Sequence, residues 1–422
     1  MLQEQINTAA TPSNSAESSK VRSAAWPVRR LFVEEEKAAA MRLFDQCIER
    51  GVPIGYNGPE EKAYCEDFSE LLGGGWADAV NSGTNALFLA LAVLDLPPYS
   101  EVIVPPITDA GGAMPVAILN CIPVPADCAP GGFNSGPKEI EARITERTSA
   151  IVVMHAAGLP VDMDGVMEVA RRHNLPVVED CAQAHGSTYQ GKCVGTFGAT
   201  AAFSTMFGKT HAFGGQGGVV FTTDETRYQR IQELSDRGKP KNRPAGTRNV
   251  IASLNFSCDE LHAAIGREQL KKLPGFMQRR RDIGNTIAAG CRNLQAIRMV
   301  EGPKGSNPVY WFLVFHYPEE KFSVGKGEFV EALKAEGIPF EADYNYLPME
   351  YEWATNHHCL GTSGHPWNSP QYSGDPSATY PTPVAKEMIH THFRLIINEA
   401  IDDQTVADIL AALEKVEARF LV

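Results

Sequence analysis

The sequence predicts an α/β fold: a large domain around a mainly parallel, mixed central sheet flanked by helices, and a smaller α+β domain at the C-terminal end. Two observations predict this class. Short apolar runs, typical of buried parallel strands, alternate with helical patterns through the first part of the chain. After Asp224 the pattern changes, and a second set of strands and helices follows. With 422 residues, 43% of them hydrophobic, the chain can bury a large core in two domains.

The large domain begins with helical patterns and continues with strands. Residues 60–72 predict an amphipathic helix that ends at three glycines, and residues 84–94 predict an almost wholly apolar, buried helix. The apolar runs that predict strands are residues 102–104, 150–154, 176–179, 201–204 and 218–222. Residues 163–173 lie between two of these runs and predict a crossover helix.

The later part of the chain is predicted to be mostly helical. Helices are expected over residues 227–237, 259–273, 326–336 and 402–419, with a strand over residues 309–317. Residues 344–379 are rich in aromatic residues, His, Pro and Gly, and a loop of that length indicates a functional or interface segment. We expect residues 1–25 to form a disordered tail or arm, residues 26–280 the large domain and residues 281–422 the small domain.

Composition excludes several classes of protein. The formal net charge of −13 argues against a nucleic-acid or anionic-membrane partner. None of the nine cysteines forms a C-x-x-C pair, which favours reduced thiols over disulfides or a cysteine-rich zinc site. No stretch reaches the roughly 18 apolar residues of a membrane helix, and the N-terminal tail lacks the apolar core of a signal peptide. We therefore expect a cytoplasmic protein without a metal.

The first candidate site segment is residues 81–84, directly before the helix expected at 84–94. Small and hydroxyl-bearing residues, here Ser82, Gly83 and Thr84, expose backbone N–H groups at a helix start, where the helix dipole favours an anion. A phosphate group would be a natural ligand. Taken alone, an ordinary helix cap is the stronger interpretation.

The second segment, residues 179–186, follows the strand expected at 176–179. Asp180 at a strand end can hold a protonated ring nitrogen, which pyridoxal phosphate (PLP) needs when it acts as an electron sink. Gln183 and His185 would follow it into the site as neutral hydrogen-bonding groups. The alternative is that Asp180 caps the next turn and His185 lies in the core.

The third segment runs from Ser204 to Lys209 and on to the glycine-rich residues 214–218. A lysine in a partly apolar pocket can lose its proton and attack a carbonyl, as a Schiff base requires. The glycines allow tight turns and close approach to a flat ring. A solvated surface lysine is the alternative, but Lys209 has small and apolar neighbours and no adjacent charge. Together the three segments predict a PLP site with a phosphate cradle, a ring-nitrogen partner and an imine-forming amine.

From about Trp26 to the C-terminus the sequence resembles the DegT–DnrJ–StrS family of sugar aminotransferases, PLP enzymes of the aspartate-aminotransferase fold. The most specific motifs are Ser82-Gly83-Thr84, residues 177–186 (VVEDCAQAHG), and Ser204 with Lys209 five residues further along, followed by Gly-Gln-Gly-Gly. Residues 254–266 (LNFSCDELHAAIG) are similar to the family's motif ahead of its long helix.

The resemblance implies a role for each matching residue. Lys209 would carry the cofactor as a Schiff base, Asp180 would pair with the ring nitrogen, and Gln183 would lie near the phenolic oxygen. The matching phosphate-binding positions are Gly83, Thr84 and Ser204. Asn255 matches an asparagine that reaches the phosphate of the neighbouring subunit, which implies a homodimer with shared active sites.

Three departures from the family pattern lie around this core. Asp109, which we also expect to line the cofactor site, stands where the family often has an aromatic residue over the cofactor ring. Thr210 follows the lysine in place of an asparagine, and Ser257 replaces an arginine. We interpret these as substrate or subgroup differences.

The implied activity is ping-pong transamination, in which glutamate or glutamine gives its amino group to a keto sugar. We expect the acceptor to be linked to a nucleotide. A free sugar, a cyclitol or another ketone is the alternative. One alternative is a sugar dehydratase of the same family, in which histidine replaces the lysine; His211 is the nearby histidine. Another is a non-catalytic regulatory homologue. The residues that could contact substrate, although structural roles are favoured, are His316, Tyr344, Tyr346, His357 and His358.

Overall fold

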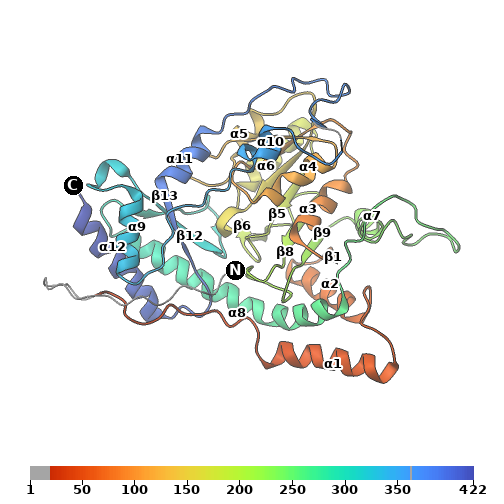
Figure 1. The fold of residues 1–422 in the computed structure, drawn as a ribbon, viewed down its shortest axis with the longest axis horizontal. Coiled ribbons are helices and arrows are strands. Elements are labelled where there is room, and N and C mark those ends of the chain that lie inside the picture. Colours follow the sequence, from red (N-terminus) through yellow and green to blue (C-terminus); the bar gives the residue numbers. More distant parts are fainter. Residues whose placement is uncertain (1–19, 362–363) are drawn as a thin grey trace.

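A seven-stranded mixed sheet forms the centre of the molecule (Figure 1). The computed structural model describes residues 20–361 and 364–422. Across the sheet the strands are β1 (Trp76–Val80), β9 (Gly218–Thr222), β8 (Thr200–Ser204), β5 (Val177–Asp180), β4 (Thr148–Met154), β2 (Glu101–Val104) and β3 (Ile122–Pro125). From β8 to β3 all neighbours are parallel, whereas β9 is antiparallel to β1 and β8. The predicted mainly parallel, mixed sheet is confirmed.

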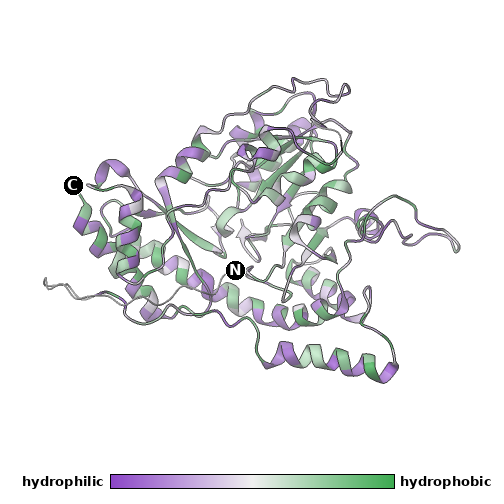
Figure 2. Cartoon of the chain, in the orientation of Figure 1, coloured by the Kyte–Doolittle hydropathy of each residue, from purple (hydrophilic) through white to green (hydrophobic). Residues whose placement is uncertain are grey.

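Helices cover both faces of this sheet, which explains the continuous apolar runs in its strands. In β2, Val102 and Val104 belong to the core with α3 (Gly83–Ala92), whereas Ile103 packs in the core of α6 (Met163–His173). Figure 2 shows apolar strands inside and helices with two differently coloured sides around them. The fully buried positions therefore alternate between two separate apolar layers.

The sequence prediction missed both edge strands, β1 and β3. β1 carries a buried aspartate, Asp78, in the middle of an alanine-rich segment. β3 contains Pro123 and Pro125, and proline is tolerated in a sheet only at an edge or a bulge. The pairing with β9 and β2 therefore overrides weak local preferences.

The loop region predicted at residues 344–379 covers the β3 edge. Trp367 and Tyr372 form one apolar cluster with Ile122 and Val124 of β3. This segment contains the short helices η4 (Pro348–Glu350) and α10 (Glu352–Thr355). It shields an edge that would otherwise be open to pairing with another chain.

A smaller α+β unit follows, built on a three-stranded antiparallel sheet. Its strands are β10 (Arg298–Met299), β12 (Phe312–His316) and β13 (His392–Ile396). Its helical elements are η3 (Glu319–Lys321), α9 (Lys326–Ala335), α11 (Pro383–Thr391) and α12 (Asp403–Phe420). Shorter elements elsewhere in the described residues, together with helix α7, are η1 (Ala110–Gly112), α4 (Met114–Ile118), α5 (Pro137–Glu141), η2 (Ala156–Gly158), β6 (Thr188–Tyr189), β7 (Lys192–Cys193), α7 (Glu225–Ser235) and β11 (Ser306–Asn307).

One long helix, α8 (Glu260–Cys291), runs beneath both units (Figure 1). The expected end of this helix at residue 273, just before Pro274, is wrong. Leu273 packs in a core of the large sheet, and Ile283 and Ile287 pack in the core of the smaller unit. Burial on both sides outweighs the helix-breaking tendency of one proline. The proposed domain boundary at residue 280 falls inside this helix and stays a prediction.

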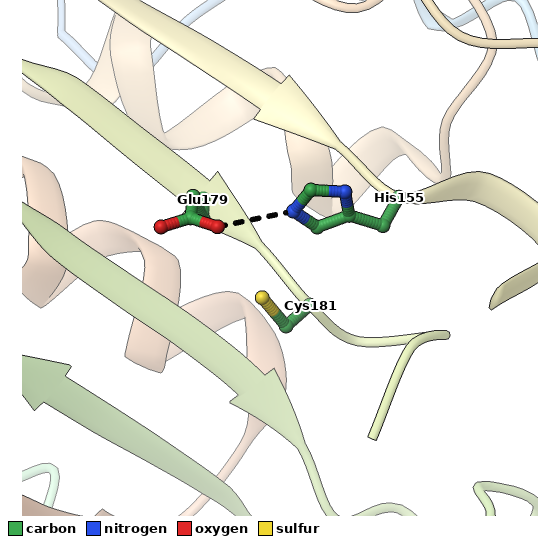
Figure 3. Close-up of side chains that lie close together, drawn as sticks. All are labelled: His155, Glu179 and Cys181. Atoms are coloured by element: carbon green, nitrogen blue, oxygen red, sulfur yellow. Dashed lines mark hydrogen bonds and ion pairs between the residues drawn. The ribbon is translucent and has the colours of Figure 1, made fainter. Parts of the chain in front are cut away.

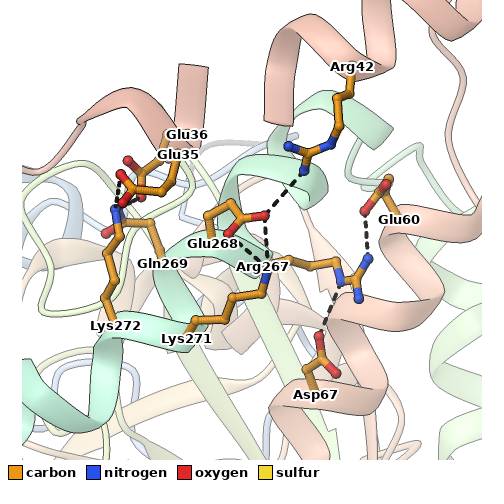
Figure 4. Close-up of polar contacts among 10 residues, drawn as sticks. All are labelled: Glu35, Glu36, Arg42, Glu60, Asp67, Arg267, Glu268, Gln269, Lys271 and Lys272. Atoms are coloured by element: carbon orange, nitrogen blue, oxygen red, sulfur yellow. Dashed lines mark hydrogen bonds and ion pairs between the residues drawn. The ribbon is translucent and has the colours of Figure 1, made fainter. Parts of the chain in front are cut away.

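The helices α1 (Glu34–Arg50) and α2 (Pro59–Leu71) are fastened to α8 by polar contacts (Figure 4). The buried carboxylate of Glu36 accepts hydrogen bonds from Lys272 at 2.5 Å and from Gln269 at 2.6 Å. Arg267 pairs with Glu60 and Asp67 of α2 at 2.9 and 3.2 Å. Partly exposed ion pairs such as these add little to stability. The buried carboxylate of Glu36 is therefore the main polar link between α1 and α8.

The expected N-terminal tail is described only from Lys20. Residues 1–19 lie outside the described residues, and residues 20–25 run as an arm over the smaller unit. Arg22 pairs with Asp408 of α12 at 2.7 Å, and its backbone N–H donates to Glu336 O at 2.9 Å. The nine cysteines are all unpaired. Within the described ranges, no helix combines the length and apolar character needed to cross a bilayer.

Candidate active site

A cavity of about 370 Å³ lies between the carboxyl ends of the large sheet and the smaller sheet. Of the predicted site residues, those that line it are Gly83, Thr84, Asp109, Asp180, Gln183, Ser204 and Lys209. The facing wall comes from the smaller unit and includes Trp311, Tyr344 and Arg394. Segments more than 100 residues apart therefore meet at the edge where ligands of α/β sheets bind.

The start of α3 forms the expected anion cradle. Ser82 caps the helix by accepting a hydrogen bond from Asn85 N at 3.1 Å, and the first N–H groups of a helix have no acceptor within it. At Gly83, a Cβ atom would lie 2.5 Å from Ser204 Cβ, so only glycine allows this approach. Thr84 and Ser204, which both carry hydroxyls, line the same cavity as the start of α3. Hydroxyls and backbone donors at one point suit a phosphate group.

Asp180 is the last residue of β5, and only 7% of its surface is exposed. Its Oδ1 accepts a hydrogen bond from Ala182 N at 2.9 Å. Burial raises the pKa of this carboxyl, while the bond from Ala182 and the charge of Lys209 work in the opposite direction. A buried acid in this position is suited to a cationic partner such as a protonated ring nitrogen.

The end of β5 is held by a fully buried cluster of His155, Glu179 and Cys181 (Figure 3). Glu179 accepts hydrogen bonds from the backbone N–H groups of Gly195, Phe197 and Gly198 at 2.6–2.7 Å. It also contacts His155 Nε2 at 3.2 Å, while His155 Nδ1 accepts from Val161 N. The carboxylate and imidazole are therefore already occupied by protein donors, and the cluster fixes the strand end that carries Asp180.

Lys209 is buried, with 9% of its surface exposed, so the surface-lysine alternative is wrong. Its Nζ lies 3.9 Å from the centroid of the Trp311 ring. Burial lowers the pKa of the amine to about 8, although the charges of Asp180 and Asp109 oppose that shift. A lysine with this pKa supplies a neutral amine close to physiological pH, as attack on a carbonyl requires.

Sequence reasoning missed Trp311 and Arg394. Arg394 interrupts the apolar strand β13, and that charge inside an apolar run was an available signal. Its guanidinium pairs with Glu341 and lies 4.8 Å from the centroid of the Tyr344 ring. Its buried Nε has no hydrogen-bond partner among the described residues. Trp311 has no comparable local signal, because only the docking of the smaller unit places it at Lys209.

Gln183 and Tyr344 meet inside the cavity. Gln183 Nε2 donates to the Tyr344 hydroxyl at 2.8 Å, and its Oε1 accepts from Ala157 N at 2.7 Å. Tyr346 also lines the cavity. Both tyrosines thus reach the site, whereas His316 lies beside His392 and His357 stacks on Trp367, away from it.

Asp109 lines the cavity, and its Oδ1 accepts a hydrogen bond from Gly111 N at 2.9 Å. His185 does not line it: its ring is buried between Phe203 and His211. His211 is buried with its Nε2 bonded to the Tyr64 hydroxyl at 2.8 Å, so it cannot replace Lys209. Burial is the main cause that lowers the pKa of both histidines. The pKa of His211 falls to about 3.

Asn255 is exposed and lies outside the cavity of its own chain. Its carbonyl accepts from Asn81 Nδ2 at 3.4 Å, and its side-chain oxygen accepts from Ser257 N at 3.1 Å. Its assignment to the phosphate of a neighbouring subunit therefore stays a prediction.

A buried lysine amine, a buried carboxylate and an anion cradle at the carboxyl edge of a mainly parallel sheet are groups that fit PLP, and they indicate the class of enzymes that attach a cofactor to a lysine. Residues 34–414 match the model of the DegT/DnrJ/EryC1/StrS aminotransferase family. The chain belongs to this family, and it is an enzyme of the aminotransferase class.

Three comparisons illustrate the relationship. The chain is 31% identical over 309 residues to the L-glutamine:scyllo-inosose aminotransferase of Streptomyces griseus, covering 71% of this chain and 72% of that one. It is 40% identical over 206 residues to the GDP-perosamine synthase of Caulobacter vibrioides, covering 49% and 55%. The solved aminotransferase of Psychrobacter cryohalolentis superposes with a TM-score of 0.80 at 27% identity, covering 94% and 99% of the chains.

Proposed function

We propose that this enzyme uses PLP to transfer an amino group from glutamate or glutamine to a ketone on a sugar or cyclitol ring. The observation that carries the proposal is the buried amine of Lys209, with a pKa near 8, in one cavity with Asp180. When bound, PLP would supply an aldehyde for the lysine and a ring that delocalises electrons from the reacting carbon.

Each residue has a separate task in this scheme. Gly83, Thr84 and Ser204 hold the phosphate, Asp180 keeps the ring nitrogen protonated, and Lys209 moves a proton to and from the reacting carbon. Lys209 suits proton transfer because its pKa of about 8 lies close to physiological pH. Gln183 and Asp109 complete the cofactor wall.

Arg394 is proposed to bind the carboxylate of the amino donor. Among the described residues that line the cavity, Lys209 and Arg394 are the cationic side chains. Glu341 pairs with Arg394 through Nη2 of the guanidinium. A guanidinium matches a carboxylate with two parallel hydrogen bonds. Glutamate and glutamine both carry such a group, so Arg394 supports an amino-acid donor without choosing between them.

The acceptor class rests on the relatives. One relative is named for scyllo-inosose and another for GDP-perosamine. These names support a ring ketone, with or without a nucleotide, as the acceptor. We also propose a cytoplasmic homodimer with shared active sites and no nucleic-acid or membrane partner, in keeping with the net charge of −13 and nine unpaired cysteines.

The test is the visible absorption spectrum of purified protein with added PLP, recorded before and after glutamate or glutamine, beside a Lys209→Ala variant. Wild type is expected to give the band of lysine-bound PLP, which the donor then removes, and the variant is expected to lack it. Absence of PLP binding by wild type would refute the proposal. Binding without response to either amino acid would reject both donors.

A further inference from the structure

We propose that Arg29, Glu399 and Arg280 form a positioning clamp, here called the arginine clamp, that fixes Lys209 against Trp311. Arg29 comes from the segment directly before α1, Glu399 from the segment after β13, and Arg280 from the second half of α8. None of them lines the cavity. The inference rests on the proposed role of Lys209 and adds the residues that hold it.

On one side of the clamp, Arg29 binds the backbone at Lys209. Arg29 Nη1 donates to Lys209 O at 2.6 Å, and Nη2 donates to Thr210 O at 2.7 Å. The same guanidinium pairs through Nε with Glu399 Oε2 at 2.9 Å. Next to this pair, Asn398 Nδ2 donates to Pro27 O at 2.9 Å, which holds the segment that carries Arg29.

On the other side, Arg280 binds the backbone at Trp311, the residue that covers the lysine amine. Glu399 Oε1 pairs with Arg280 Nε at 2.7 Å, and Arg280 Nη1 donates to Tyr310 O at 2.9 Å and Trp311 O at 3.3 Å. The Trp311 indole N–H donates to Gly208 O at 3.0 Å, directly before Lys209. The Trp311 ring then lies 3.9 Å from Lys209 Nζ. The contacts thus form a closed circuit around the lysine.

The clamp is buried, so its geometry is strongly determined. The exposed fractions of the side chains are 17% for Arg29, 9% for Glu399 and 2% for Arg280. One carboxylate serves two guanidiniums, and removal of one partner of a buried pair leaves an uncompensated charge. The bonds from both arginines end on the backbone at Lys209 and Trp311, whose side chains meet in the cavity. A purely structural network would not need to end at both the residue that carries the amine and the residue that covers it.

This arrangement restricts where the lysine amine can lie. A long side chain loses rotamer freedom when it is ordered, and a fixed backbone and a fixed covering ring keep the amine near one geometry. A displacement of about 1 Å at a reacting group can cost on the order of 100-fold in rate. The clamp residues are positioning residues, because they act through Lys209 and Trp311.

The test compares Glu399→Gln and Arg29→Lys with the matched control Asp408→Asn. Asp408 pairs with Arg22, in the same segment before α1 as Arg29, at 2.7 Å, but Asp408 does not line the cavity. The first readout uses apo-protein mixed with PLP, quenched with borohydride at intervals, with the label at Lys209 quantified by mass spectrometry. The second is kcat and KM for the amino donor, measured at a temperature where all variants are folded by circular dichroism.

Glu399→Gln is expected to slow labelling of Lys209 about 10-fold or more and to lower kcat by about 10- to 100-fold, with the donor KM within about 3-fold of wild type. Arg29→Lys keeps the charge but not the forked donors, so it should lie between Glu399→Gln and wild type. Asp408→Asn should match wild type in both readouts.

The clamp inference fails if folded Glu399→Gln labels and turns over like Asp408→Asn. If Glu399→Gln does not fold, Arg29→Lys decides the matter by the same two readouts. A wild-type protein that PLP does not label at Lys209 would instead overturn the proposed function, so the two failures are distinguishable.

Discussion

At Lys209, burial and neighbouring charge act on the amine in opposite directions. Desolvation disfavours the ammonium form, while the carboxylates of Asp180 and Asp109 and the Trp311 ring favour it. The resulting pKa of about 8 leaves part of the lysine neutral near physiological pH. Asp109 therefore matters even though it cannot stack on a ring, because its carboxylate adjusts the charge of the lysine.

The first prediction concerns pH. The rate at which apo-protein reacts with PLP at Lys209 should rise with pH through a midpoint near 8 and level off above it, since only the neutral amine attacks. Asp109→Asn removes a charge that raises the lysine pKa, so the midpoint should move to lower pH. Borohydride trapping at a series of pH values measures it. A midpoint near the ordinary lysine value, or a shift to higher pH in the variant, would contradict this account.

The second prediction concerns Arg394. Arg394→Gln should raise the KM for glutamate or glutamine by about 10- to 150-fold, since a hydrogen bond to a charged group contributes about 1.5–3 kcal/mol. The absorption band of lysine-bound PLP should be unchanged. Arg172→Gln, which removes a half-exposed surface pair with Glu141, is the matched control. An effect on the acceptor KM alone would assign Arg394 to a carboxylate on the acceptor.

At the scale of elements, α8 joins the two units because it presents small residues where other segments press against it. A Cβ on Gly284 would lie 2.2 Å from the Tyr310 ring, and one on Gly290 would lie 2.5 Å from Leu410. A Cβ on Gly275, in the same helix, would meet no atom of another segment within 4 Å. The glycines of α8 are therefore not equivalent, and their positions show where the smaller unit docks.

The third prediction uses this difference. Gly284→Ala should lower the free energy of unfolding by about 1–3 kcal/mol through overpacking against Tyr310. Gly275→Ala should leave it unchanged or raise it by up to about 1 kcal/mol, because alanine has the higher helix propensity. Urea unfolding followed by circular dichroism provides the measurement. Equal effects of the two substitutions would show that the close contact with Tyr310 is not a constraint.

At the scale of the whole molecule, the site is shared between units that contribute different chemistry. The large sheet supplies Asp180 and Lys209, and the smaller sheet supplies Arg394. Beside the lysine, Phe207 is 61% exposed, and beside Asn255, Leu254 is 69% exposed. Exposed apolar residues next to Lys209 and Asn255 suit the proposed interface with a second copy of the chain.

The fourth prediction tests that dimer. Lys209→Ala and Asn255→Ala should each lower activity, but co-refolded mixtures should recover up to about a quarter of wild-type activity, because half of randomly formed dimers contain one intact site. Light scattering of each variant checks that both remain dimeric. No recovery in a mixture that has exchanged subunits would place Asn255 in a role within its own chain.

The sequence by itself determined the α/β class, the central strands and the segments that carry Gly83, Asp180, Ser204 and Lys209. These features are local: apolar runs predict buried strands, and small or charged residues directly after a strand lie at its carboxyl end. The resemblance of short motifs to a known family then predicted which residue has which task. The edge strands were missed because Asp78 and the prolines of β3 weaken their local pattern.

Only the tertiary structure decided what faces those residues. The course of α8 through Pro274, the covering of the β3 edge, and the meeting of Trp311 and Arg394 with Lys209 depend on packing between distant segments. The pKa of Lys209 has the same origin, because burial by other parts of the chain lowers it. Periodicity and motifs report the neighbours of a residue along the chain, whereas burial and charge depend on its neighbours in space.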